Sequence, residues 1–284
     1  MYIINRFSIL VILLSLCWQI GADTCGTADI ASGAVTGCEC APSFNDSGCN
    51  PCTDKYCNDA SLFGNLHTCE IGCTSDNINC NACYLYFNGV CRCVKNTALD
   101  CINKGGDWWL LNSHTLISTQ KQIPGVLQLH SDNKGWELGQ MLLGSTGITL
   151  PPGGNAVTRK TGTLAVNSVH ARTEEQIHIH VCDNPNSPLR RYLSGIDPTT
   201  YTSLTTLPTS FANFPQGTVH CQASKTPGET MNVAEITAQY LNTVTKPCDK
   251  SYVGAGVIFD SRDYTWGCLT TTGHSGEDLF CKLT

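Results

Sequence analysis

The sequence predicts an α+β fold with an antiparallel sheet and few helices, preceded by a small disulfide-rich region. Two observations carry this expectation. Thirteen of the 19 cysteines fall between Cys25 and Cys101, and only five follow. After that boundary, apolar segments alternate in the manner of strands, Gly, Pro and Thr are frequent, and helical spacing is confined to short stretches.

The first 22 residues have the pattern of a signal peptide. An apolar run from Ile9 to Leu14 follows Arg6, and small residues stand at Gly21 and Ala22. The run is short for about 30 Å of hydrocarbon, so an uncleaved signal anchor is the lesser interpretation. Secretion, or residence in the lumen of the secretory pathway, is therefore expected, and that compartment permits disulfides.

Residues 23–104 are predicted to form a region held together by disulfides. The region is poor in large aliphatic residues, so cross-links must replace the core that it cannot build. Cys49–Cys52 and Cys80–Cys83 have zinc-knuckle spacing, but disulfides are favoured in a secreted chain. Without Cys17, 18 cysteines remain, in two odd groups of 13 and five, so complete pairing requires at least one bridge between the regions.

Residues 105–284 are predicted to form the α+β domain. Two β-type runs, 253–259 and 264–269, indicate a hairpin with a four-residue loop. Apolar residues at helical spacing predict one helix over 233–244, and 136–143 is a candidate for another. The Thr-rich, Pro-broken stretch 198–210 is expected to be a loop.

Charge excludes one class of partner. The formal net charge is −6, so the basic footprint of a nucleic-acid-binding protein is missing. The basic pairs Arg159-Lys160 and Arg190-Arg191 are candidates to attract an anionic substrate, although a solvated surface pair is the commoner explanation.

One short segment carries the candidate chemistry. Gln176-Ile-His-Ile-His-Val-Cys182 alternates strictly, so a strand would place His178 and His180 on one face, about 7 Å apart along the chain. Such a pair can supply a nucleophile and a proton or charge partner. Two other interpretations remain open: structural or solvent-facing histidines, and a metal site that would need a third ligand.

A probable turn just upstream offers groups that suit phosphate oxygens. Asn167, Arg172 and Thr173 supply an amide, a planar guanidinium and a hydroxyl. Asn167 and Thr173 are also common turn residues, so backbone geometry alone explains them equally well. Cys182 is expected to join a disulfide and not to act as a catalytic thiol.

Segment 164–182 resembles the signature of the CDP-diacylglycerol pyrophosphatases, a branch of the histidine triad superfamily. That signature has an apolar strand, Asn-Ser, a turn with Arg-Thr, and then His-x-His with a cysteine two places on. Weaker similarity covers 115–125, like the family's strand and turn before its helix, and 252–269, like its closing hairpin. The resemblance spans about half of 105–284 and none of the cysteine-rich region.

The chain also departs from that pattern. Ala171 stands where the family usually has Gly, Glu174 where it has Gln, and Gln176 where the first histidine of a triad would stand. This register makes His178 the central, attacking histidine, and a shift by two residues would make it His180. Both are named as catalytic, with His178 slightly preferred.

The resemblance implies hydrolysis of a nucleotide phosphoanhydride, most simply CDP-diacylglycerol to CMP and phosphatidate, through a nucleotidyl-histidine. His178 and His180 would be catalytic, and Asn167, Arg172 and Thr173 would bind phosphate. No metal or other cofactor is implied. The partner would be a nucleotide-lipid or nucleotide, with contact to a membrane surface through the lipid.

The rival hypothesis is a secreted, non-catalytic binding or adhesion protein in which the histidine domain has decayed. Thirteen clustered cysteines make the kind of rigid, multi-loop module that displays surfaces to partners. The sequence does not identify the partner of that region. The two hypotheses differ on whether His178, His180 and Arg172 converge in one pocket.

Overall fold

The structure is a computed structural model, and it describes part of the chain. The described residues are 102–103, 105–111, 115–119, 123, 125–129, 132–145, 147–150, 156–168, 171, 177–245, 249–250 and 252–284. The predicted signal peptide, nearly all of the cysteine-rich region, and the site candidates Arg172 and Thr173 lie outside these residues. In the described part of the chain, no helix combines the length and apolar character needed to cross a bilayer.

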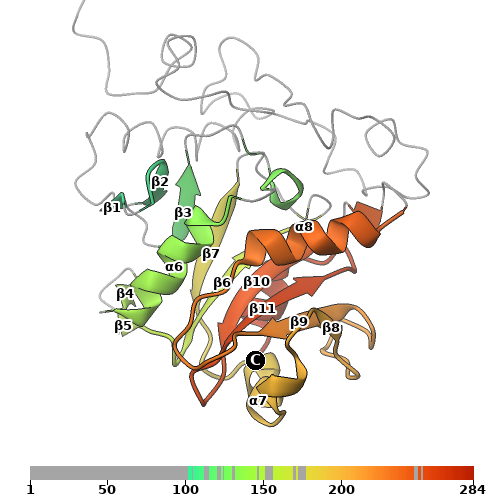
Figure 1. Cartoon of the computed structure of the whole chain (residues 1–284). Coiled ribbons are helices and arrows are strands. Elements are labelled where there is room, and N and C mark those ends of the chain that lie inside the picture. Colours follow the sequence, from blue (N-terminus) through green and yellow to red (C-terminus); the bar gives the residue numbers. More distant parts are fainter. Residues whose placement is uncertain are drawn as a thin grey trace, which may run out of the picture.

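An antiparallel sheet organises the described residues (Figure 1). Nine strands lie in the order β1-β2-β3-β7-β6-β10-β11-β9-β8, and β4 and β5 form a separate pair. The strands are β1 (Ile102–Asn103), β2 (Trp108–Leu110), β3 (Leu116–Thr119), β4 (Ile148–Thr149), β5 (Ala156–Val157), β6 (Gly162–Val166), β7 (His178–Asp183), β8 (Thr205–Thr206), β9 (Val219–Ala223), β10 (Gly254–Phe259) and β11 (Thr265–Thr270). The α+β class with an antiparallel sheet is therefore confirmed.

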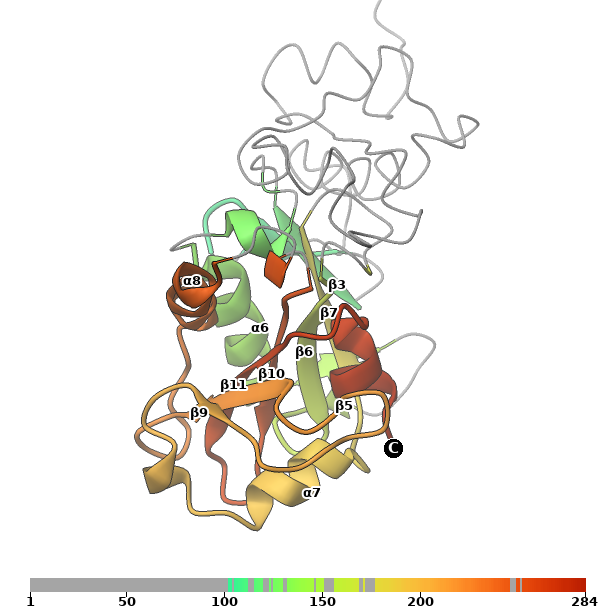
Figure 2. The ribbon, with the colours of Figure 1, turned by 90° about the vertical axis from the view of Figure 1, so that its right-hand side faces the viewer.

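Helical segments cover both faces of the sheet. They are η1 (Val126–Gln128), α6 (Lys134–Gly144), α7 (Pro188–Ser194), η2 (Pro198–Thr200), α8 (Val233–Thr243) and η3 (Asp278–Lys282). Figure 2 shows α6 and α8 on one side of β6 and β7, and the red C-terminal segment on the other. The two faces therefore pack against different parts of the chain.

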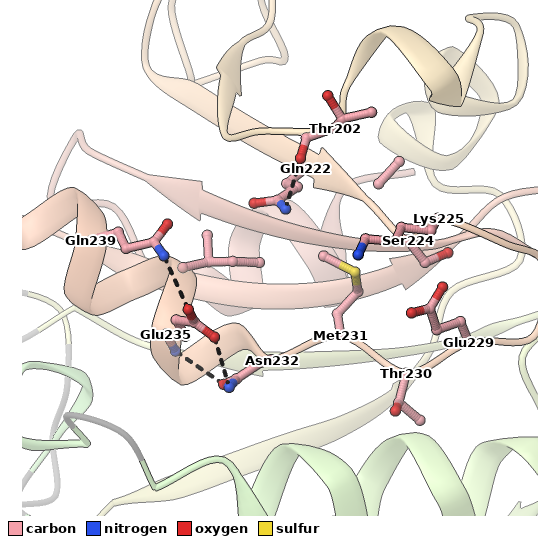
Figure 3. A pocket seen from close by; sticks show the side chains of 12 residues that line it. Thr202, Gln222, Ser224, Lys225, Glu229, Thr230, Met231, Asn232, Glu235 and Gln239 are labelled. Atoms are coloured by element: carbon pink, nitrogen blue, oxygen red, sulfur yellow. Dashed lines mark hydrogen bonds between the residues drawn. The ribbon is translucent and has the colours of Figure 1, made fainter.

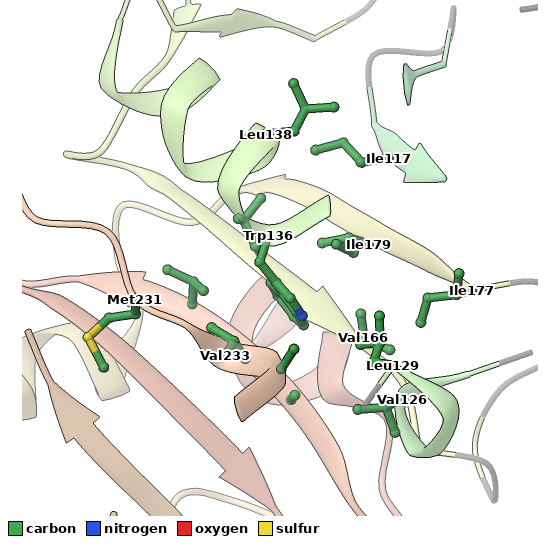
Figure 4. Close-up of a cluster of buried hydrophobic side chains, with 14 of the residues drawn as sticks. Ile117, Val126, Leu129, Trp136, Leu138, Val166, Ile177, Ile179, Met231 and Val233 are labelled. Atoms are coloured by element: carbon green, nitrogen blue, oxygen red, sulfur yellow. The ribbon is translucent and has the colours of Figure 1, made fainter. Parts of the chain in front are cut away.

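Each face has its own apolar core. On the α6 and α8 side, Trp136 of α6 lies among Ile179 of β7 and Val233 of α8 (Figure 4). On the opposite side, Phe280 of η3 packs over β10, where a side chain at Gly256 would collide with its ring. A glycine in this strand thus lets the C-terminal segment approach the sheet closely.

The predicted hairpin is confirmed as β10 and β11, with a loop one residue longer than expected. Phe259 pairs with Thr265, so the loop contains five residues, 260–264. The Asp260 carboxylate sets this length, because it accepts hydrogen bonds from the backbone N–H groups of Arg262 (2.8 Å) and Tyr264 (3.0 Å). The pattern of apolar residues in the sequence does not predict such hydrogen bonds to an aspartate side chain.

The two predicted helices are confirmed as α6 and α8. Helix α8 begins after Asn232, whose side chain accepts a 3.1 Å hydrogen bond from the Glu235 N–H, and ends before Val244, which is extended. The stretch 198–210 is mostly irregular, as expected, but includes η2 and β8. The short helices α7 and η3 were not predicted, because each is too brief to show a repeated apolar spacing.

Two disulfides lie within this domain. Cys182 pairs with Cys281 and Cys221 pairs with Cys268, which confirms the expectation that Cys182 is bridged. The first bridge joins the histidine strand β7 to the C-terminal segment η3. Of the five cysteines after residue 105, these bridges use four, and the fifth, Cys248, lies outside the described residues.

Because the two groups of cysteines are both odd in number, these two bridges lead to a prediction about Cys248. If the predicted signal peptide with Cys17 is removed and the other 18 cysteines are all bridged within the chain, Cys248 must pair with one of the thirteen cysteines at 25–101. Peptide mapping of the full protein, expressed through a secretory pathway and kept under non-reducing conditions, should therefore recover a peptide containing Cys248 linked to a peptide from that region. Recovery of Cys248 as a free thiol would contradict the prediction.

Candidate functional site

The two candidate histidines project from the centre of the sheet. Strand β7 lies between β3 and β6, and its residues Ile179 and Val181 enter the core on the α6 and α8 side. His178 and His180 therefore point to the opposite face, as the alternating pattern predicts. Their ring centroids are 4.8 Å apart and the ring planes cross at 73°. A strand paired on both sides fixes this spacing.

His178 lies close to the sheet and is almost covered. It is opposite Ser118 of β3, whose hydroxyl donates a 2.6 Å hydrogen bond to the carbonyl of Ile177. Only 5% of His178 is exposed. Access to this imidazole is therefore narrow in the present conformation.

The neighbours of His180 define its protonation state. Its Nδ1 lies 3.3 Å from Oε1 of Glu277, and its Nε2 is buried and has no hydrogen-bond partner within the part of the chain that the structure describes. Burial, followed by the charges of His178 and Lys282, lowers the pKa of His180 to about 3. The ring is therefore neutral at neutral pH, and its contact with Glu277 is not an ion pair.

A compact hydrogen-bond network holds Glu277 in place. The Asn167 amide donates to Oε2 of Glu277 (3.2 Å), and the Asn167 carbonyl oxygen accepts from the Glu277 N–H (3.1 Å). The hydroxyl of Ser275 donates to the same oxygen at 2.6 Å. Asn167, predicted to bind phosphate, thus contacts the C-terminal segment through both ends of its amide. Phosphate binding by Asn167 stays a prediction.

Two hydrogen bonds and one disulfide attach the C-terminal segment to the sheet and to the end of β7. The carbonyl of Phe280 accepts hydrogen bonds from Thr163 Oγ1 and Asn184 Nδ2, both at 3.0 Å, and the Cys281 disulfide ties the segment to β7. Lys282 extends from this segment and places its Nζ 3.7 Å from Oε2 of Glu277. The site therefore combines two imidazoles, a carboxylate and an ammonium group.

Glu277 and Lys282 were missed by the sequence reasoning, because about a hundred residues separate them from the histidines. The signal that could have found them is the Cys182–Cys281 pairing, since Cys281 lies next to Lys282 and close to Glu277. Five cysteines permit many pairings, so the sequence alone did not single out this one.

One arginine from each of the two basic pairs, Arg159 and Arg190, has a structural role. The Arg190 guanidinium is buried and donates to the carbonyls of Arg159, Phe259 and Gly162. Burial lowers its pKa to about 10, so it stays charged at neutral pH. The Arg159 guanidinium lies over the Phe259 ring and donates to Asp263. Neither arginine is therefore free to bind an anion without losing these contacts.

A cleft of about 330 Å³ lies elsewhere, between β9 and the start of α8 (Figure 3). Its lining includes Gln222, Lys225, Glu229, Met231 and Glu235. It belongs to the α8 side of the sheet, whereas the histidines face the η3 side. This cleft is therefore not the pocket that the histidine hypothesis requires.

The described residues contain no cluster that suits a metal ion. Among them, no three His, Cys, Asp or Glu side chains come close enough to hold one.

In comparisons with known proteins, no family model matches the chain and no curated protein does. The resemblance to the CDP-diacylglycerol pyrophosphatases rests on the quoted residues.

The depressed pKa of His180 predicts acid sensitivity of folding. An unfolded chain binds a proton near pH 6.5, whereas folded His180 resists protonation down to about pH 3, so stability falls as pH drops through this window. At full effect the slope from this group is about 1.4 kcal/mol per pH unit. Urea unfolding between pH 7 and pH 4.5 should show a shallower loss in His180→Gln than in the wild type. Identical slopes in the two proteins would contradict the lowered pKa of His180.

Proposed function

We propose that this domain hydrolyses a nucleotide phosphoanhydride, with CDP-diacylglycerol as the substrate that the resemblance favours and CMP and phosphatidate as products. The observation that carries the proposal is the pair of imidazoles on one sheet face, their rings 4.8 Å apart. His180 has a neutral ring at neutral pH, and its buried Nε2 has no partner among the residues described in the structure. A neutral imidazole with an unshared electron pair is the form that attacks phosphorus.

The proposed reaction has two displacements. An imidazole nitrogen of the pair attacks the phosphorus on the cytidine side, and the P–O bond to the phosphatidate oxygen breaks with its electron pair. Water then attacks the nucleotidyl-histidine, the N–P bond breaks, and CMP leaves. The second imidazole handles a proton or balances charge during these steps.

Anion binding would come from the segment before β7, which the sequence predicts to be a turn, and from the C-terminal segment. Arg172 and Thr173 are proposed to contact the phosphoryl oxygens, as the resemblance implies. Lys282 adds a cation whose Nζ lies within 3.7 Å of the carboxylate beside His180. A lipid substrate would bring this face to a membrane surface, and the scheme requires no metal or other cofactor.

One observation favours the rival function, a non-catalytic secreted binding protein. His178 is only 5% exposed and the side chain of His180 only 15%, which is the burial expected of structural histidines. In that case the cysteine-rich region would carry the binding surface. The two candidates differ in one measurable property, which is turnover.

The test is release of CMP from CDP-diacylglycerol in mixed micelles by the full secreted chain. Wild type should turn over, and His178→Ala and His180→Ala should each lower kcat/KM by at least about a hundredfold, since each removes a nucleophile or a proton carrier. His220→Ala is the matched control, because His220 lies on β9 against Tyr240 and should leave turnover unchanged. No CMP from the wild type, or equal rates in all variants, would refute the proposal.

A further inference from the structure

A carboxylate of the C-terminal segment lies next to one nitrogen of the His180 ring. A neutral imidazole carries its proton on either Nδ1 or Nε2, and the neighbouring groups select between them. Nδ1 lies 3.3 Å from a carboxylate oxygen of Glu277. An ionised carboxylate has no proton to donate, so it acts only as a hydrogen-bond acceptor. Nε2 is buried, and no group of the described residues forms a hydrogen bond with it.

We propose that Glu277 is a positioning residue that keeps the proton of His180 on Nδ1, so that Nε2 of His180 carries the attacking electron pair. The inference rests on the proposed hydrolysis and adds to it the choice of nucleophile and a residue that the histidine signature does not contain. It favours His180 over His178, the slightly preferred candidate of the sequence.

Asn167 makes this positioning precise. Glu277 has two carboxylate oxygens, and the Asn167 amide donates to Oε2 while Oε1 faces His180. The backbone N–H of Glu277 also donates to Asn167, so both the main chain and the side chain of Glu277 are tied to the end of β6. A carboxylate held this way orients an imidazole better than one on a free side chain.

The carboxylate also suits the charge that develops in the reaction. When Nε2 bonds to phosphorus, Nδ1 retains its proton and the ring becomes cationic, while the electron pair of the breaking P–O bond moves to the leaving phosphate oxygen. Glu277 lies beside the new positive charge and stabilises it. When water displaces the nucleotidyl group, Nε2 regains its electron pair and the water proton leaves with CMP or solvent.

Burial of Nε2 has a consequence for substrate binding. The atom is covered in the present conformation, so a phosphoryl group reaches it only after the atoms above it move. Catalytic contacts often form only in the substrate complex. The tautomer of the free protein is therefore the cleanest readout, because it does not depend on any substrate.

The experiment combines NMR and kinetics on the full chain. In protein labelled with ¹⁵N-histidine, the His180 signal, assigned by its loss in His180→Ala, should show a protonated Nδ1 and an unprotonated Nε2 at neutral pH. Glu277→Gln removes the charge while keeping the shape, and should shift His180 towards the Nε2-protonated tautomer. Glu277→Asp keeps a carboxylate and should restore the Nδ1 tautomer in part.

Kinetics should follow the same order. Glu277→Gln should lower kcat about tenfold to a hundredfold with KM unchanged, the size found for residues that orient a reacting group. Glu235→Gln is the matched control, since Glu235 lies in the first turn of α8, on the other face of the sheet, and its kcat and tautomer should equal the wild type.

The two claims fail in different ways. An Nε2-protonated His180 in the wild type, or an unchanged tautomer and kcat in Glu277→Gln, overturns the role of Glu277 and leaves the hydrolase proposal standing. Absence of turnover in the wild type refutes the hydrolase, and the tautomer measurement still decides whether Glu277 positions the proton.

Discussion

The contact between strand β7 and the C-terminal segment is the constraint on which the site depends. The Cys182–Cys281 bridge closes a sequence separation of 99 residues, and two hydrogen bonds to the Phe280 carbonyl fix the same segment on the sheet. Without this contact, Glu277 and Lys282 would have no reason to lie near His180. The site at the histidines therefore combines residues from distant parts of the chain.

The burial of His180 is a second constraint, and it opposes stability. Removing an imidazole from water disfavours its charged form, and an unpaired buried nitrogen loses the hydrogen bonds that water would supply. Buried polar groups without a partner are rare in proteins, and a catalytic role is one explanation for them. The same burial is compatible with a structural histidine, which is why turnover and not geometry separates the two proposed functions.

The sequence was informative where the signal is local. Strict alternation from Ile177 to Cys182 placed both histidines on the face away from the main core, and the spacing of Val233, Ile236 and Tyr240 located α8. The loop of the β10–β11 hairpin was one residue longer than expected, because the Asp260 carboxylate accepts hydrogen bonds from backbone N–H groups within it. Glu277 could not be found, since its position depends on a disulfide pairing that spacing does not determine. Arg172 and Thr173 lie outside the described residues, so their roles stay predictions.

Trapping the covalent intermediate would test the central claim most directly. CDP-diacylglycerol labelled in the cytidine phosphate would be mixed with the protein, quenched under conditions that preserve phosphoramidates, and the protein digested and analysed by mass spectrometry. A nucleotidyl group on the peptide that contains His178 and His180, with fragmentation placing it on His180, is the predicted result. Release of labelled CMP without any adduct on that peptide, or an adduct on a different residue, would contradict the account.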